Sequence, residues 1–268
     1  MNERQLADLK RAVTLLENPN FGAKVANAVG TPIEKAITLL PNNTQQLIGK
    51  IAQKSILAAL KIAIKTMDHY DPISALPPPE SSDWWHAAAS MATGAVGGAF
   101  GLAALAVELP ITTTIMVRSI ADIARSEGVD LRSPEAQLEC ISIFAMGGPS
   151  SSDDGSEIGY FIAREAMTRA VAQAAAYVAK NGIQKETAPA LVRLILAVAE
   201  RFSIPITQKA AAQAIPVVGA VGGALINTIF MDHFQDMARG HFTVLRLEAE
   251  IGADIVRAKY QELRHENA

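Results

Sequence analysis

The side chains best suited to chemistry in this sequence form two similar charged sets. Both have the spacing i, i+4, i+7, which places the three side chains of each set on one face of a helix. The sets are Arg118, Asp122 and Arg125, and Asp232, Asp236 and Arg239. If the two helix faces meet, Arg118 can pair with Asp236 and Arg239 with Asp122. Charges on apolar helices are costly to bury unless they are paired, so the first interpretation is an ion-pair network that fixes helix register.

A binding or catalytic site is the alternative interpretation. Glu108, Asp122, His233, Asp236 and His241 carry oxygen and nitrogen donors that could bind a metal or act as acid and base, with arginines holding an anion. The candidate polar cluster therefore comprises Glu108, Arg118, Asp122, Arg125, Asp232, His233, Asp236 and Arg239.

Motif spacing argues against metal and nucleophile chemistry. Di-metal helical bundles use Glu-x-x-His on two helices, and the instance here, Glu262 to His265, lies in the C-terminal tail. The sequence contains no G-x-S-x-G elbow and no phosphate-binding loop, and Cys140 has no local acid or base beside it. We expect no catalytic residues, no metal and no cofactor, and we favour a non-enzymatic protein over an enzyme.

Two uncharged runs precede the charged sets, Ala87–Val107 and Ala210–Met231. Each contains the hexapeptide GAVGGA, and IADIAR at 120–125 is matched by FQDMAR at 234–239, which predicts a degenerate internal repeat. Glycines one turn apart form a glycine-zipper pattern that lets another helix approach closely. We expect two Gly-rich helices to cross at Gly94, Gly97, Gly98, Gly101, Gly219, Gly222 and Gly223.

The first uncharged run, Ala87–Val107, is long enough to cross a bilayer, but it is built from Ala and Gly rather than Leu and Ile. This composition favours packed core helices, with an integral membrane protein as the alternative. Lys50, Lys54, Lys61 and Lys65 lie largely opposite the apolar stripe of 44–67. They predict a solvated face, or in the alternative a surface that contacts anionic headgroups.

Composition limits the partners and the location. Charged residues make up 19% of the 268 residues, hydrophobic ones 50%, and the net charge is -3. No basic run suited to nucleic acid occurs, so we expect no nucleic-acid partner. The start MNERQLADLK lacks the apolar segment of a secretory signal, and a single cysteine cannot form an intramolecular disulfide. We expect a cytoplasmic protein, peripheral at the inner face of the membrane.

Helical periodicity over most of the chain predicts one all-α domain, residues 1–268, built as a compact bundle around the two Gly/Ala-rich helices. Its expected subdivisions are a peripheral N-terminal helix within 1–30, a Pro-rich connector at 71–82 and a mobile loop at 150–157.

Prolines and glycines predict several helix boundaries. Pro110 should end one helix path and begin another, and a helix should begin at Ser133-Pro134. The helix that starts near Pro189 should reach about Phe202. The chain should finish as one long helix.

The segment ATGAVGGAFGLAALAVELPITTTIMVRSIADIARSEGVDLRSPEAQLECISIFAMGG, from Ala92 to Gly148, is followed by IPVVGAVGGALINTIFMDHF from Ile215 to Phe234. Together they resemble the bacterial EcsC family, over a region from about Gly30 to the C-terminal helix. The resemblance implies an all-α bacterial protein from a family named for its association with a transporter operon. It favours a place near a membrane and supplies no catalytic residues.

These observations lead us to expect a non-enzymatic accessory protein that associates with a membrane or a membrane protein complex, its partner being a membrane lipid or a membrane protein. The runner-up is a small-ligand-binding or metal-binding protein, or a hydrolase, with a polar site between the two repeats. The third hypothesis is an integral membrane protein.

Overall fold

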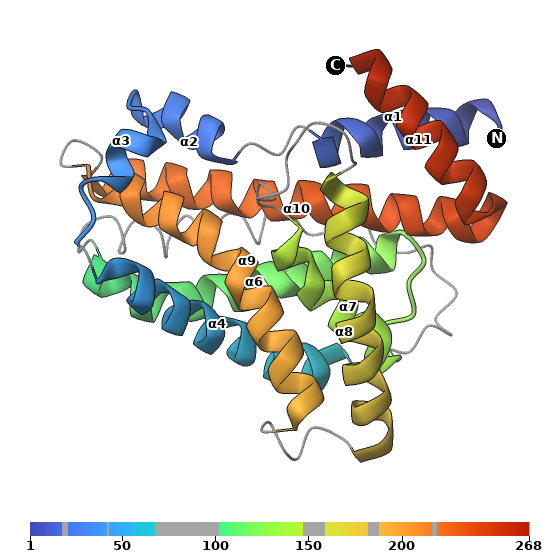
Figure 1. Ribbon diagram of the computed structural model, residues 1–268, viewed down its shortest axis with the longest axis horizontal. Coiled ribbons are helices and arrows are strands. Elements are labelled where there is room, and N and C mark those ends of the chain that lie inside the picture. The colour runs from blue at the N-terminus through green and yellow to red at the C-terminus, as the bar shows by residue number, and fades with distance from the viewer. Residues whose placement is uncertain are drawn as a thin grey trace.

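The computed structural model describes residues 1–17, 21–41, 43–67, 102–146, 159–181, 188–215 and 219–267 (Figure 1). These residues form α-helices and one short 3-10 helix, with no strand among them, which confirms the predicted all-α class. The elements are α1 (Glu3–Glu17), α2 (Phe21–Val29), α3 (Ile33–Ile37), α4 (Thr44–Met67), α6 (Leu102–Ser126), α7 (Pro134–Ser142), η1 (Ile143–Ala145), α8 (Gly159–Asn181), α9 (Pro189–Gln213), α10 (Gly219–Ile251) and α11 (Ala253–Asn267).

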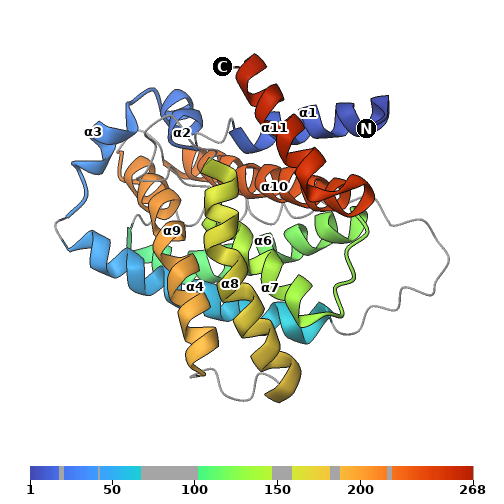
Figure 2. The same cartoon turned by 45° about the vertical axis from the view of Figure 1, so that its right-hand side comes forward.

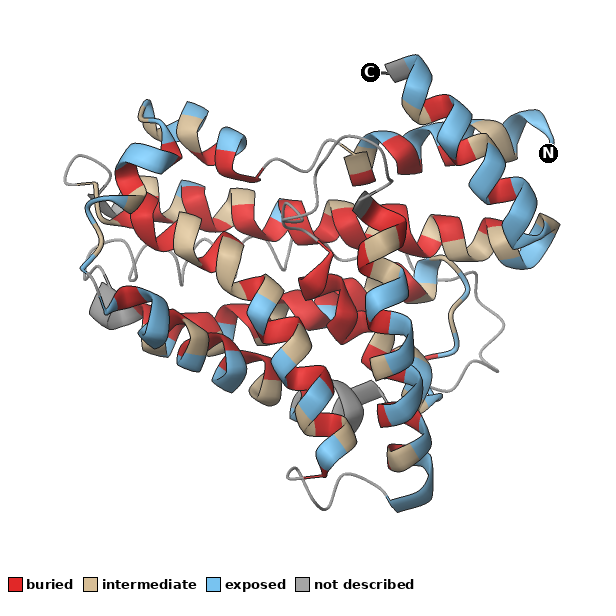
Figure 3. Cartoon of the chain, viewed as in Figure 1, coloured by how far each residue is buried: buried red, intermediate tan, exposed pale blue. Residues whose placement is uncertain are grey.

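Helix α10 is the axis of the molecule. It has 33 residues and therefore spans about 50 Å. Helices α1, α2, α6, α9 and α11 all pack against it, and burial runs along most of its length (Figures 1 and 3). Figures 1 and 2 both show α1 and α11 beside one end of α10, with α6 on its other side.

Helix α6 runs parallel to α10 in a constant register. The Gln235 amide donates a hydrogen bond to Ser119 Oγ at 2.7 Å, and Thr243 Oγ1 donates to Glu127 at 3.1 Å. Ser119 and Glu127 are eight residues apart in sequence, and so are their partners Gln235 and Thr243, in the same order. The two helix axes therefore run in the same direction. The two segments proposed as repeats, 120–125 and 234–239, therefore lie side by side.

Aromatic rings join four elements in the core. Phe144 of η1 packs against Phe202 of α9 with ring centroids 4.9 Å apart, and Phe202 lies 5.4 Å from Phe234 of α10. Phe21 of α2 reaches Phe230 of α10 at 5.3 Å in an edge-on arrangement. These large side chains are almost completely buried, so they link the N-terminal helices to the centre of the bundle.

Two prolines that should end helices lie inside them. Pro110 is within α6, and α9 continues past Phe202 and through Pro205 to Gln213, so both predicted boundaries are wrong. A proline in a helix removes one backbone hydrogen bond, and packing can offset that loss. Leu109 beside Pro110 and Ile206 beside Pro205 are both fully buried, which holds the two helices through their prolines.

Glycine sets two of the ends as expected from its conformational freedom. Gly128, with φ +86°, follows the end of α6 and stops that helix. Gly252, with φ +95°, ends α10 and turns the chain into α11, so the C-terminal region is two helices rather than one. Ser133 accepts a hydrogen bond from the Ala136 amide at the start of α7, confirming the predicted cap.

The helix expected within residues 1–30 is α1, and a second helix, α2, follows it in the same region. The second uncharged run is divided, since α9 ends at Gln213 and α10 begins at Gly219. No helix in the described ranges has the length and apolar character that crossing a membrane requires. The Pro-rich connector at 71–82, the loop at 150–157 and the glycines Gly94 to Gly101 lie outside the described residues. The crossing of two Gly-rich helices therefore stays a prediction.

Helix α1 approaches α10 closely at Gly240. A Cβ atom at this position would meet Leu16 Cγ at 2.5 Å and the Ala12 carbonyl oxygen at 3.2 Å. We expect Gly240→Ala to push α1 outward and lower the free energy of unfolding by about 1–3 kcal/mol, measured by urea denaturation. Gly49→Ala in α4 is the matched control, because a Cβ atom there has no neighbour within 4 Å. Equal stability of the two variants would contradict the close approach.

Candidate functional site

The parallel register of α6 and α10 places most of the candidate polar cluster along one side of this helix pair. Arg118 on α6 and Asp232 on α10 are exposed, while the side chains one and two turns further along are half-buried. Near the C-terminal end of α6 the two helices line a common pocket, to which α6 contributes Ile123 and Ser126 and α10 contributes Arg239 and Thr243.

Two ion pairs on this side each lie within one helix, and a third reaches α2. Arg125 donates to Asp122 at 2.6 Å, and Arg239 approaches Asp236 at 3.4 Å. Lys24 of α2 lies 3.4 Å from the same Asp236 carboxylate. The pairs predicted across the two helices, Arg118 with Asp236 and Arg239 with Asp122, stay predictions.

Glu108 belongs to a separate, buried set of polar side chains. Lys209 Nζ of α9 lies 2.5 Å from Glu108 Oε1 and donates to Asn227 Oδ1 of α10 at 2.6 Å. Thr112 Oγ1 donates to the same Glu108 oxygen at 3.4 Å. We call Glu108, Thr112, Lys209 and Asn227 the polar core. It ties α6, α9 and α10 together.

Sequence analysis named Glu108 but missed its three partners. The sequence feature that could have pointed to these partners is Lys209, a lone cation directly before the uncharged run Ala210–Met231. Burial lowers the pKa of Lys209, and the charge and hydrogen bond of Glu108 oppose that effect only in part. The ammonium group also lies 4.9 Å from the centroid of the Phe230 ring, which favours the charged form.

The two histidines named as candidate ligands are both buried in α10. The His233 ring packs between Phe21, at 5.5 Å, and Phe234, at 4.9 Å. His241 lies between two polar side chains: its Nδ1 is 2.9 Å from the Tyr160 hydroxyl of α8, and its Nε2 is 2.9 Å from Glu139 Oε1 of α7.

Glu139, His241 and Tyr160 form a polar series of acid, imidazole and hydroxyl, in which His241 and Tyr160 are buried and Glu139 is half-buried. Burial alone would raise the pKa of Glu139, but the hydrogen bond and charge of His241 outweigh it, helped by Arg164, so the pKa is lowered. Burial raises the pKa of Tyr160, and its side chain is nearly inaccessible. A hydroxyl without access to substrate does not act as a nucleophile, so this series joins α7, α8 and α10 structurally.

Cys140 and the acidic side chains point to the same interpretation. Cys140 is fully buried, and burial raises the pKa of its thiol, which keeps it protonated and unreactive. In the described ranges no three His, Cys, Asp or Glu side chains gather in a way that could hold a metal ion.

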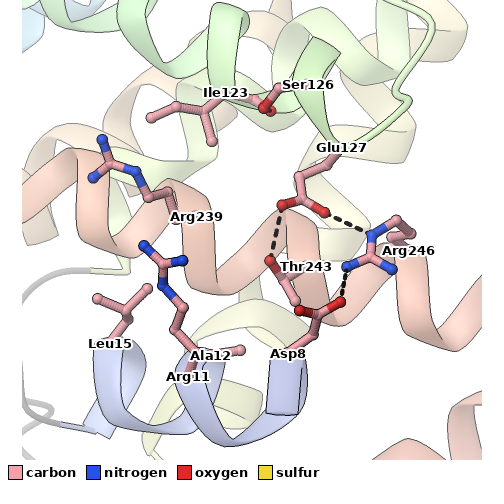
Figure 4. A pocket seen from close by; sticks show the side chains of 10 residues that line it. All are labelled: Asp8, Arg11, Ala12, Leu15, Ile123, Ser126, Glu127, Arg239, Thr243 and Arg246. Carbon is pink, nitrogen blue, oxygen red and sulfur yellow. Dashed lines mark hydrogen bonds and ion pairs between the residues drawn. The ribbon is translucent and has the colours of Figure 1, made fainter. Parts of the chain in front are cut away.

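A pocket of about 220 Å³ lies between α1, the C-terminal end of α6 and α10 (Figure 4). Arg246 on its wall is held by carboxylates from both neighbouring helices, Glu127 at 2.7 Å and Asp8 at 2.8 Å. Arg11 of α1 and Arg239 of α10 also line it. Through Arg239, this pocket adjoins the candidate polar cluster.

Removing one partner of the Glu108–Lys209 pair in the polar core should lower the unfolding free energy far more than removing both. Lys209→Met leaves the Glu108 carboxylate buried without its cation, and we expect a loss of about 3–5 kcal/mol in unfolding free energy. The double variant Glu108→Leu/Lys209→Met should recover most of that loss, as measured by urea denaturation. If the loss of unfolding free energy in the double variant equals the sum of the losses in Glu108→Leu and Lys209→Met, the two side chains are not coupled.

The lowered pKa of Glu139 predicts a pH dependence of stability. The ionised carboxylate stabilises the fold above its unfolded-state pKa of about 4.3, and this contribution is lost as the pH falls through the lower, folded-state value. The stability difference between wild type and Glu139→Gln should therefore narrow below about pH 4. Glu135→Gln, at an exposed position of the same helix, is the control and should show no such narrowing.

Comparison with known proteins gives one match. The model of the EcsC protein family matches residues 3–247, a region that contains both charged sets, the polar core and the pocket. Comparisons with curated proteins and with solved structures gave no match. Because the family match covers nearly the whole chain, the chain belongs to the EcsC protein family.

Proposed function

We propose that the protein is a non-enzymatic accessory that associates peripherally with a membrane surface. The observation that carries the proposal is an exposed apolar surface at the N-terminal ends of α6 and α10. Val107 and Ile111 of α6 are 68% and 49% exposed, and Leu225 of α10 is 47% exposed. We call these three residues the apolar end.

The three side chains lie on the same side of the helix pair. Val107 and Ile111 are one turn apart on α6, on the face that continues to Arg118. Leu225 lies on the face of α10 that continues to Asp232. The long uncharged run Ala87–Val107 leads directly into this part of α6. Large apolar side chains grouped in this way on a surface are typical of contact with another protein or a membrane.

The exposed lysines of helix α4 favour a membrane with anionic lipids. It packs on α6 and exposes Lys50, Lys54 and Lys61, and its 24 residues include no Asp or Glu. Basic side chains beside an apolar surface favour binding to anionic headgroups. The buried polar core and the Glu139, His241 and Tyr160 series fit a structural role, which agrees with a non-enzymatic protein.

Sedimentation with lipid vesicles tests the proposal. Wild type should sediment with vesicles containing phosphatidylglycerol more than with pure phosphatidylcholine vesicles. The triple variant Val107→Ser/Ile111→Ser/Leu225→Ser should bind at least about tenfold more weakly, because each exposed side chain contributes about 1 kcal/mol when lipid buries its remaining surface.

The control removes exposed apolar side chains elsewhere. Leu196 of α9 and Ile255 of α11 are 46% and 54% exposed, so Leu196→Ser/Ile255→Ser matches the change in chemistry. This control should bind vesicles like wild type. Wild type that stays in solution with both vesicle types, or a triple variant that binds normally, would contradict the proposal.

A further inference from the structure

Two exposed leucines lie outside the apolar end, in the segment that joins α3 to α4. Leu39, in the turn after α3, is 58% exposed, and Leu47, in the first turn of α4, is 45% exposed. Backbone hydrogen bonds hold the chain at both ends of this segment. The Leu39 amide donates to the Ala36 carbonyl at 3.1 Å, and the Thr44 amide donates to the Pro41 carbonyl at 2.9 Å. We call Leu39 and Leu47 the α3–α4 corner.

The chain around this corner is basic. Residues 35–67 contain five lysines and no Asp or Glu, and the acidic residue closest to them on the N-terminal side is Glu34 of α3. Lys50 and Lys54 are exposed, and within the described residues neither forms an ion pair. They follow Leu47 at i+3 and i+7, so the three side chains share one face of α4. An exposed leucine therefore lies on a face whose charged residues are all cationic.

The α3–α4 corner lies at the same end of the molecule as the apolar end. In Figure 1 the longest axis is horizontal, and α3 and the first turns of α4, α6 and α10 all lie at its left side. Figure 2 shows the same grouping from a second direction. Helices α1 and α11 lie toward the opposite end in both views. The exposed apolar residues of α4, α6 and α10 are thus gathered at one end of the long axis.

We infer that the α3–α4 corner is a second point of contact with an anionic membrane, and that the molecule docks by this end rather than along the side of α4. The contact rests on the proposed membrane function and gives it an orientation. Leu39 and Leu47 enter the boundary between headgroups and acyl chains, while Lys50 and Lys54 lie beside the lipid phosphates. An anionic bilayer satisfies both kinds of side chain, because its interface buries apolar groups and its surface potential attracts cations.

Position along α4 distinguishes docking by the end from docking along the side. Lys50 is three residues from Leu47, about 5 Å along the helix axis, whereas Lys61 is fourteen residues away, about 21 Å. The Debye length at physiological ionic strength is about 8 Å. In docking by the end, the charge of the membrane therefore acts on Lys50 and is screened from Lys61. In docking along the side, it acts on both.

Fluorescence of a label at residue 39 tests the contact. The full chain with Leu39→Cys is labelled with a thiol-reactive nitrobenzoxadiazole dye, which reacts at the new cysteine because Cys140 is fully buried. Vesicles containing phosphatidylglycerol should shift the emission to shorter wavelength, because the dye leaves water. Ile255→Cys is the matched control, since Ile255 is 54% exposed on α11 at the opposite end. Its label should keep the emission that it has in water.

Sedimentation of charge variants with the same vesicles tests the orientation. Lys50→Gln should raise the Kd for vesicles about fivefold, because a lysine near an anionic surface contributes about 1 kcal/mol. Lys61→Gln should raise it by less than about twofold, because of its distance from the surface. Both lysines are exposed positions of one helix, so both variants should fold like wild type, which circular dichroism checks.

The outcomes separate this contact from the proposed function. Wild type that fails to sediment with the vesicles overturns the membrane function and the α3–α4 contact together. Wild type that sediments while the label at residue 39 keeps its emission in water overturns the contact alone. Equal effects of Lys50→Gln and Lys61→Gln overturn docking by the end, and in both of these cases the membrane function stands.

Discussion

The parallel packing of α6 along α10 is the constraint on which the rest of the structure depends. Two hydrogen bonds, from Gln235 to Ser119 and from Thr243 to Glu127, fix the register of the pair. Because both helices advance in the same direction, similar positions in the two sequences lie side by side. An apolar end, a charged middle and a pocket at the far end thus follow one another along a single side of the pair.

Polar side chains inside the bundle specify which helices are neighbours. The polar core joins α6, α9 and α10, and the series from Glu139 through His241 to Tyr160 joins α7, α10 and α8. Such buried groups add little net stability compared with apolar packing, but they penalise any arrangement that leaves them without partners. In a bundle rich in alanine, where many helix faces are similar in shape, this penalty is a physical reason for one arrangement to prevail.

The all-α class and several helix ends could be predicted from the sequence, because they depend on local properties. Ser133 caps a helix and Gly128 ends one through their own side chain or backbone, whatever surrounds them. The helix boundaries predicted at Pro110 and near Phe202 were wrong, because the effect of a proline such as Pro110 or Pro205 depends on how firmly the flanking residues pack. Lys209 was missed as a partner of Glu108 because only the fold brings α9 between α6 and α10. The pocket could not be predicted from the charged sets, because its lining brings Arg239 of one set together with Arg11, from a helix more than 200 residues away in sequence.

Both ends of the described chain come together at one corner of the molecule (Figure 1). Tyr260 of α11 donates to Glu17 of α1 at 2.7 Å across 243 residues of sequence, and Arg246 of α10 reaches Asp8 of α1 across 238. During synthesis, α1 therefore leaves the ribosome long before its docking surface exists. Its apolar stripe, which includes Leu9, Val13 and Leu16, must wait for α10 and α11 to be translated. Completion of this fold is thus a late event, and the nascent protein carries an uncovered helix for most of its translation.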